Sequence, residues 1–497
     1  MSVDSISSRS AKALTWGVAG AVGKVVAQLF VQITLARILD PVAFGQYAAV
    51  LAVFGLGYIL ADSGFGAALI QKKELHSTDI GMALGWSVLF ASVMALLMIL
   101  SSTMLAQLFG DVSLGPIFRA CALLIPFQIV SNLSSSLLRR DLHLKGIQII
   151  QLVAYFVCFG GVATVLAING FGVWSLVAGF AAQTIFSLLA TYSLARHTLR
   201  PRLIGDRALI HFGIKSMATE LTSWSMDNLD RFLVGKFWGM YSLGLYSVAF
   251  NLSKAPSGLL ISTAQNIAFA STSRLHGNLG AVRKGFLVVL AAVALTTLPI
   301  FTLAACESEV VLNIVYGFKW IKAAPYMTAL AIAIPFISMG AITAAILRGT
   351  GSVGTELQIL MISGAILFSG FLMLSHMSLM LAVWSVPFAY LVRFLLLLTA
   401  IRSRLNLSAA EVLSIFRGAI VLSVAGLSVA LLMHTSSDLR TSAMGVLPLL
   451  AGGAVIALLF ISRFSWFLGE ALADMVRTKF STGRFGPVLN WLQRGGH

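Results

Sequence analysis

The segment IPFQIVSNLSSSLLR, residues 125–139, recurs as IPFISMGAITAAILR at residues 334–348. Both copies begin with Ile-Pro-Phe and end with Leu-Arg, and they lie 209 positions apart. Upstream, LARILDPVAFGQYAAV (35–50) aligns with VGKFWGMYSLGLYSVA (234–249) at an offset of 199. This alignment pairs Arg37 with Lys236, Gly45 with Gly244 and Tyr47 with Tyr246. Two ordered matches at nearly the same offset indicate that the chain arose by doubling a unit of roughly two hundred residues.

The composition is that of a membrane protein. Hydrophobic residues make up 58% of the chain and charged residues 10%, and the mean hydropathy is +0.92. Soluble domains have about 25% charged residues. Apolar runs of spanning length, about 20 residues each, follow one another with short breaks. We therefore predict an all-α integral membrane protein with about fourteen transmembrane helices.

The repeat and the apolar runs together predict the organisation of the chain. An even number of spans separates the two copies, so both have the same orientation in the membrane, as in transporters whose substrate site lies between two halves. We predict two pseudo-symmetric six-helix bundles joined by a cytoplasmic linker, then two extra helices and a basic cytoplasmic tail. The boundaries are 1–195 and 212–401 for the bundles, 196–211 for the linker, 402–462 for the extra helices and 463–497 for the tail.

The net charge of +16 reports orientation rather than a nucleic-acid partner. With both termini placed in the cytoplasm, roughly 24 of the 34 lysines and arginines fall in cytoplasmic loops and tails, which is the positive-inside pattern. One such cluster contains Arg139, Arg140 and Lys145. We predict a multi-pass protein of the bacterial inner membrane, with both termini cytoplasmic and with membrane lipids as partners of its basic surface.

No pattern in the sequence indicates catalysis. Cys121, Cys158 and Cys306 are odd in number and lack ligand spacing, so neither a disulfide framework nor a zinc site is expected. The chain also lacks the GxSxG, P-loop and HExxH motifs. We predict that the protein is not an enzyme and has no catalytic residue, no metal and no cofactor.

The first predicted span carries a polar stripe. An ionisable residue at the centre of a membrane helix costs about 2.5–3.5 kcal/mol on insertion scales, so such residues mark function. Lys24, Gln28 and Gln32 recur every four residues and therefore line one face of the helix. We predict that the stripe lines a watery cavity and binds substrate. A structural hydrogen bond between helices is the alternative.

The seventh predicted span contains the densest set of charges: Glu220, Asp227, Asp230 and Arg231. Spacings of three and four residues place most of them on one face. At the offset of 199 this face aligns with the stripe of the first span. We assign Arg231 to substrate binding and the three carboxylates to ion coupling. Simple neutralisation of Asp227 by Arg231, four residues on, is the alternative.

Further ionisable residues lie within or at the end of spans, among them Lys254 and Asp62. Lys254, near the middle of the eighth span, adds a second deep cation to Lys24, and paired cations suit a substrate that carries phosphate. Deep carboxylates suit coupling to protons or sodium. Asp62 ends the second span near the cytoplasmic surface, where capping or loop contacts would explain it as well as a functional role would.

Three stretches resemble a known family. LARILDPVAFGQYAAVLAVFGLGYILADSGFGAALIQKKEL (35–75) resembles the start of Wzx-type polysaccharide repeat-unit flippases. This oligosaccharidyl-lipid flippase branch belongs to the MATE/MOP superfamily, with the MATE exporters and MurJ-type lipid II flippases. MDNLDRFLVGKFWGMYSLGLYSVAFNL (226–252) and VLNIVYGFKWIKAAPYMTALA (311–331) resemble later parts of the same family. The resemblance covers nearly the whole chain and is closest to the exopolysaccharide and colanic-acid-like branch.

The resemblance implies a fold, a substrate and partners. It implies a V-shaped pair of six-helix bundles with alternating access, and an undecaprenyl-diphosphate-linked oligosaccharide as substrate. A polysaccharide polymerase and the export machinery would be its protein partners. MurJ-like members use cavity arginines for the diphosphate, and here Lys24 stands as the central cation instead. A MATE-like cation-coupled drug antiporter and a membrane-embedded polysaccharide polymerase or ligase are the alternatives.

Overall fold

The computed structural model describes residues 3–62, 64–72, 74–197, 200–203, 207–274, 279–350 and 352–435. Within these ranges every regular element is a helix, which confirms the all-α prediction. Ten of the described helices are long and apolar enough to cross a membrane. The last predicted span and the basic tail lie outside the described residues, so the count of about fourteen spans stays a prediction. The chain divides into two compact units, Met1–Val248 and Ala249–His497.

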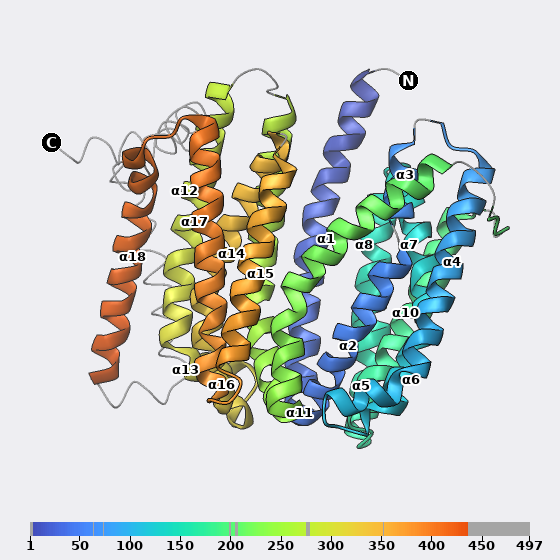
Figure 1. Ribbon diagram of the computed structural model, residues 1–497, viewed down its shortest axis with the longest axis horizontal. Helices are drawn as coiled ribbons and strands as arrows, with labels where there is room; N and C mark the ends of the chain where they lie inside the picture. Colours follow the sequence, from blue (N-terminus) through green and yellow to red (C-terminus); the bar gives the residue numbers. More distant parts are fainter. Residues whose placement is uncertain are drawn as a thin grey trace. The chain divides into compact units, whose positions relative to one another are not determined.

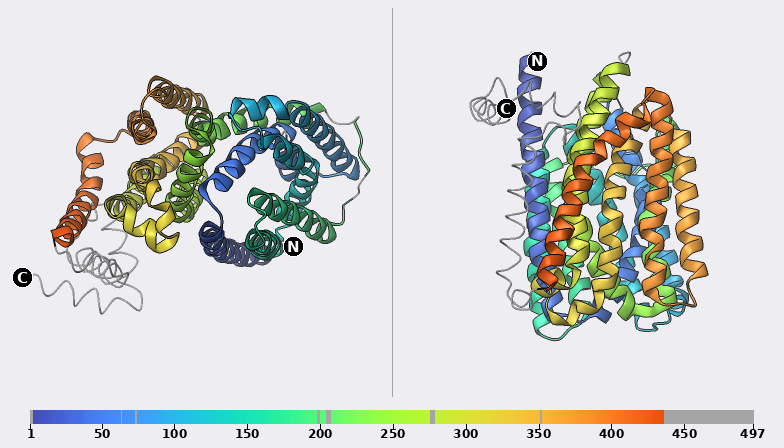
Figure 2. Two further views of the ribbon diagram at one scale, coloured as in Figure 1. Left: turned by 90° about the horizontal axis from the view of Figure 1, so that it is seen from below. Right: turned by 90° about the vertical axis from the view of Figure 1, so that its left-hand side faces the viewer.

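The first unit is built mainly from helices that lie side by side with their axes roughly aligned (Figures 1 and 2). They are α1 (Val3–Ile38), α2 (Pro41–Asp62), α3 (Phe65–Gln71), α4 (Ser77–Leu100), α5 (Ser102–Leu108), α6 (Leu114–Ala122), α7 (Ile125–Arg140), α8 (Leu144–Val153), the π-helix η1 (Ala154–Gly161), α9 (Val162–Ile168), α10 (Val173–Ala195) and the first part of α11 (Arg207–Arg274). The predicted seventh and eighth spans are the two parts of α11. They meet at Gly239, whose φ of 76° lies in the region that favours glycine.

The upstream pair of repeat segments meets within this unit. A Cβ added at Gly45 of α2 would lie 1.8 Å from the carbonyl oxygen of Met240 in α11. A Cβ added at Gly244 would lie 1.8 Å from the carbonyl oxygen of Pro41. Pro41 and Met240 are equivalent at the same offset as the two glycines, so the contact is symmetric. We call these four residues the glycine crossing, where two helix backbones touch because neither glycine has a side chain.

Part of the predicted linker is held against the first unit. The Arg202 backbone N–H donates to the Gly81 carbonyl oxygen of α4 over 2.8 Å. One turn further, the Trp86 indole donates to the Leu203 carbonyl oxygen over 3.1 Å. A Cβ added at Gly85 would lie 2.3 Å from the Arg202 oxygen. The extended segment 200–203 therefore packs directly on α4, where Gly81 and Gly85 have no side chains to obstruct it.

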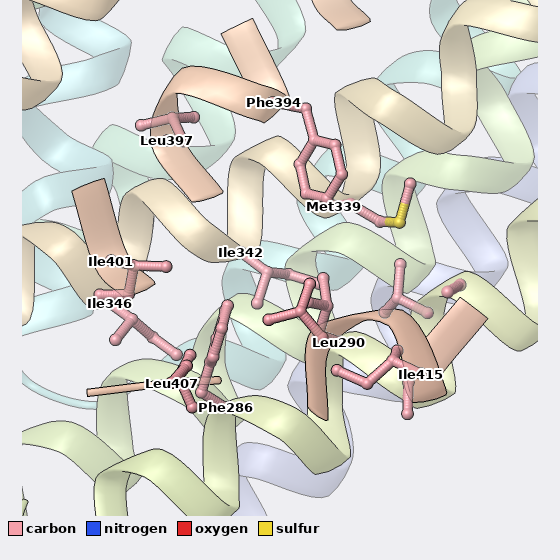
Figure 3. Packing of buried hydrophobic residues seen from close by; sticks show 14 of the residues in the cluster. Phe286, Leu290, Met339, Ile342, Ile346, Phe394, Leu397, Ile401, Leu407 and Ile415 are labelled. Carbon is pink, nitrogen blue, oxygen red and sulfur yellow. The ribbon is translucent and has the colours of Figure 1, made fainter. Parts of the chain in front are cut away.

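The second unit contains α12 (Leu279–Cys306), α13 (Ser308–Val315), the 3-10 helix η2 (Phe318–Ala323), α14 (Ala324–Gly349), α15 (Val353–Met373), α16 (Leu379–Val383), α17 (Ser385–Leu405) and α18 (Ala409–Thr435). Its main apolar core joins α12, α14, α17 and α18, with Phe286, Ile342 and Phe394 among the buried members (Figure 3). Arg283 of α12 donates to both carboxylate oxygens of Glu411 in α18, over 2.5 and 2.7 Å. That bidentate pair fixes the two helices at one end.

Candidate functional site

Polar side chains from five helices gather in the first unit. They are Lys24 (α1), Tyr58 and Asp62 (α2), Asn132 and Arg139 (α7), Gln151 (α8) and Glu220 (α11). We call them the first-unit polar cluster. The helices that carry them are otherwise apolar. Placing polar and ionisable side chains in membrane helices costs free energy, so their presence indicates a functional role.

Two hydrogen bonds hold the interior of the cluster. The Asn132 amide donates to Asp62 Oδ1 over 2.6 Å, which joins α7 to the end of α2. The Lys24 ammonium donates to Gln151 Oε1 over 3.3 Å, which joins α1 to α8. Arg139 lies close enough to both Asp62 and Lys24 for its charge to act on them. The cluster is thus one electrostatic unit rather than separate pairs.

Local sequence explains why Asp62 and Arg139 meet. α2 ends at Asp62, and Gly64, with φ of 65°, turns the chain into α3. The Asp62 carboxylate therefore sits at the negative end of a helix dipole and needs donors, which Asn132 and the Gly64 N–H supply. Arg139 follows Asn132 by two helical turns, so both side chains leave the same face of α7.

The exposure of the charged members differs. Lys24 and Asp62 are half-buried, whereas Arg139 and Glu220 are exposed. Two cations and two carboxylates make a cluster of mixed charge that can bind an anion by displacing an internal partner. Among the residues that the structure describes, no group of His, Cys, Asp and Glu could hold a metal ion.

Of the three residues in the polar stripe of the first span, Lys24 belongs to the first-unit polar cluster, whereas Gln28 and Gln32 lie further along α1. Lys24 belongs to the cluster through Gln151. Gln28 is half-buried one turn further along α1. The amide nitrogen of Gln32 is buried and has no hydrogen-bond partner in the described part of the chain. A buried amide without a partner costs free energy, which fits a group that meets a ligand or water.

The charges of the seventh span are spread along α11. Glu220 joins the cluster, Asp227 is exposed and Arg231 is half-buried. Asp230 is only 4% exposed and accepts a hydrogen bond from the hydroxyl of Tyr246, beyond the break at Gly239. Asp230 therefore braces the two parts of α11. Ion coupling by these three carboxylates stays a prediction.

The second deep lysine lies in the other unit. Lys254 follows Val248 and so belongs to the second unit, where it is half-buried. Its Nζ lies 5.1 Å from the ring centroid of Phe250, within the range of a cation–π contact. A single site shared by Lys24 and Lys254 stays a prediction.

The sequence analysis singles out Lys24 and Glu220 but places Arg139 in a basic cytoplasmic cluster and leaves Asp62 open between a role in the cavity and a cap or loop contact. One pattern pointed to Arg139, because both copies of the 15-residue repeat end in Leu-Arg. Its counterpart, Arg348 of α14, donates to the buried carboxylate of Glu356 in α15. Each copy of the repeat helix thus ends in an arginine that faces a carboxylate.

Cysteine accessibility is expected to separate the polar face from the lipid face. In a background without Cys121, Cys158 and Cys306, cysteines at Gln28 and Asp227 should react with water-soluble thiol reagents in membranes. Cysteines at Val26 and Leu229 should not. Val26 is 61% exposed on an apolar surface, so lipid rather than protein would shield it. Equal labelling at all four positions would contradict a polar cavity on these helices.

Asp227 and Arg231 offer a test of pairing against function. If they only neutralise each other, Asp227→Asn and Arg231→Gln should each reduce activity and the double variant should recover it. We expect the double variant to stay inactive, because the hypothesis assigns Asp227 to ion coupling rather than to neutralisation alone. Polymer output in a complemented deletion strain, normalised to protein in the membrane, is the measurement. Recovery in the double variant would assign the pair to structure.

The sequence matches the model of the family described as "polysaccharide biosynthesis protein" over residues 34–325, more than half of the chain. It is 23% identical over 303 residues to the succinoglycan biosynthesis transport protein ExoT of Rhizobium meliloti (strain 1021), covering 60% of each chain. It is 23% identical over 281 residues to the teichuronic acid biosynthesis protein TuaB of Bacillus subtilis (strain 168), covering 55% of this chain and 57% of TuaB. The match to the lipopolysaccharide biosynthesis protein WzxC of Escherichia coli (strain K12) is 22% over 311 residues, covering 61% of this chain and 62% of WzxC. The chain thus matches about 60% of the length of these relatives.

Solved structures share the fold. The lipid II flippase MurJ in an inward closed conformation superposes with a TM-score of 0.74 at 12% identity, covering 90% of this chain and 98% of that one. An inward-facing multidrug MATE transporter of the MOP superfamily gives 0.61 at 13% identity, covering 77% and 94%. These likenesses confirm the predicted fold class. With the matching family model, they show that the chain is a multi-pass membrane protein of the polysaccharide biosynthesis protein family.

Proposed function

We propose that the chain is a flippase that moves undecaprenyl-diphosphate-linked oligosaccharide repeat units across the membrane by alternating access, for exopolysaccharide or lipopolysaccharide synthesis. The family, the named relatives and the MurJ-like fold support this proposal. The task is to carry a polar head group past about 30 Å of hydrocarbon. No bond is made or broken, so the proposal requires neither a catalytic residue nor a cofactor.

The observation that carries the proposal is the pair of cations, Lys24 and Arg139, in the first-unit polar cluster. An ammonium serves phosphate as a point charge, and a guanidinium can bind two phosphate oxygens at once. Together they suit the two phosphates of a prenyl diphosphate, whose tail would stay in lipid. The wider proposed substrate set is Lys24, Gln28, Gln32, Arg231 and Lys254, and the proposed ion-coupling set is Glu220, Asp227 and Asp230.

The cellular setting is proposed on the same basis. The positive-inside distribution supports a bacterial inner membrane location with both termini cytoplasmic. We also propose the bundle boundaries at 1–195 and 212–401, with a linker at 196–211, because the sequence repeat supports them. A polysaccharide polymerase and export machinery would act on the repeat unit after transport.

The test is to follow lipid-linked intermediates in a strain from which the gene is deleted. We expect repeat units to accumulate in the cytoplasmic leaflet and polymer to be lost, with both defects corrected by the wild-type gene. If repeat units reached the outer leaflet but stayed unpolymerised, the protein would be a polymerase. Unchanged polymer with increased drug sensitivity would make it a drug antiporter.

A further inference from the structure

Asp62 occupies an unusual position for a carboxylate. It ends α2 at the negative pole of the helix, half-buried, yet the nearby cations are the ones the proposed function assigns to substrate. Its Oδ1 accepts the Asn132 amide over 2.6 Å, so the side chain is held in place rather than mobile in water. A fixed carboxylate beside a phosphate site would repel the substrate while it is ionised.

The side chains that act on Asp62 come from three helices of the cluster, α2, α7 and α11. Tyr58 lies one turn earlier on α2, Arg139 on α7 and Glu220 on α11, all near enough to interact electrostatically with it. Lys24 on α1 lies near Arg139 and is hydrogen-bonded to Gln151 of α8.

The charged groups on other neighbours of α2 are engaged elsewhere. On α4, Asp79 is paired with Lys72 over 2.8 Å. On α6, Arg119 donates to Ser102 over 3.0 Å. The charged side chains that act on Asp62 are therefore Glu220 and Arg139, and Lys24 in turn lies near Arg139.

We propose that Asp62 is an internal counter-anion for Arg139 and Lys24, which takes up a proton when a diphosphate binds. This inference rests on the proposed function. While the site is empty, the ionised carboxylate offsets the two cations. When the diphosphate arrives, its charge replaces that of Asp62, and a proton from water neutralises the carboxylate.

A proton fits this site better than a metal cation. Sodium and similar hard cations need several oxygen ligands, whereas Asp62 Oδ1 already accepts an N–H and a guanidinium lies nearby. A cation placed beside Arg139 and Lys24 would be repelled. A proton removes the negative charge without adding a ligand shell.

The direction of the linkage follows from the charges. Protonation of Asp62 makes the cluster more positive, so a diphosphate should bind more tightly as the pH falls. By reciprocity, diphosphate binding must be accompanied by proton uptake. Couplings between two ligands of one protein are typically 5–150-fold, and for these partly exposed groups we expect about tenfold.

The experiment measures binding of farnesyl diphosphate to the purified full-length protein in detergent, from acidic to alkaline pH, with farnesol as the control for the prenyl tail. Wild type should lose about tenfold in affinity toward alkaline pH. Asp62→Asn should bind tightly across the range. The matched control is Asp141→Asn, an exposed carboxylate just beyond α7, which should behave as wild type because water screens its charge.

A second measurement uses a pH indicator in weakly buffered solution, read while farnesyl diphosphate is added. Cations favour ionised phosphate, so the ligand itself would release protons. The same titration of Asp62→Asn corrects for that release, so wild type should take up more protons than Asp62→Asn, and an equal proton change in the two proteins would overturn the proposal. Equal pH profiles for wild type and Asp62→Asn would overturn it too, with the proposed function intact. Failure of every protein to bind the diphosphate in preference to farnesol would count against the proposed function itself.

Discussion

Gly45→Ala is expected to unfold the protein or to prevent its accumulation in the membrane. The new Cβ would lie 1.8 Å from a backbone carbonyl oxygen, so α2 and α11 would have to move apart along the glycine crossing. Overpacking in a core typically costs 1–3 kcal/mol when side chains can give way. Here the obstacle is backbone, and we expect a loss above about 3 kcal/mol. Thermal unfolding in detergent and the amount of protein in the membrane are the measurements.

Gly244→Ala should have the same effect, because the two glycines occupy equivalent places in the crossing. The matched control is Gly285→Ala in α12, where an added Cβ meets nothing within 4 Å. That change should be neutral or should stabilise the protein by up to about 1 kcal/mol through helix propensity. A melting temperature for Gly45→Ala equal to that of Gly285→Ala would show that the helices do not touch.

Lys24→Ala and Arg139→Ala are expected to reduce polymer output at least about tenfold each, since a hydrogen bond to a charged group contributes about 1.5–3 kcal/mol. The double variant should have no measurable output. Lys24→Arg should keep part of it, because the charge remains. Output in a complemented deletion strain, normalised to membrane protein, is the measurement.

Lys145→Ala provides the control for net charge. Lys145 is exposed near the start of α8, and its removal takes away the same charge as Lys24→Ala without touching the cluster. Wild-type output is expected from it. Full output from Lys24→Ala or from Arg139→Ala would remove that residue from the substrate site.

Most of the fold can be predicted from the local sequence. Apolar runs located the helices, and the alignment of Gly45 with Gly244 marked two segments that meet. Residues 117–138 form one apolar run that predicts a single helix, whereas the helix is broken between Ala122 and Ile125. Leucines fill the break, so the apolar pattern runs through it without a change, and the local signal is Pro126 in the first turn of α7.

The candidate site was predicted only in part for a related reason. Lys24 is a candidate from sequence because a lysine within an apolar run is conspicuous from one segment alone. Asp62, Asn132 and Arg139 lie near helix ends or among serines, where polar residues are ordinary. Their meaning depends on a contact between residues 70 positions apart along the chain, and periodicity within one helix contains no information about it.

The glycine crossing also bears on how such a chain arose. Gly45 meets the carbonyl of Met240 and Gly244 meets that of Pro41, so residue and partner exchange places between the copies. Reciprocal contact of this kind defines an isologous interface between two identical subunits. A single-copy ancestor would have presented the same glycine to itself across a two-fold axis and could have paired before its gene was fused. In that ancestor one mutation would have changed the glycine on both sides of the interface at once. After fusion, each glycine could mutate independently of the other.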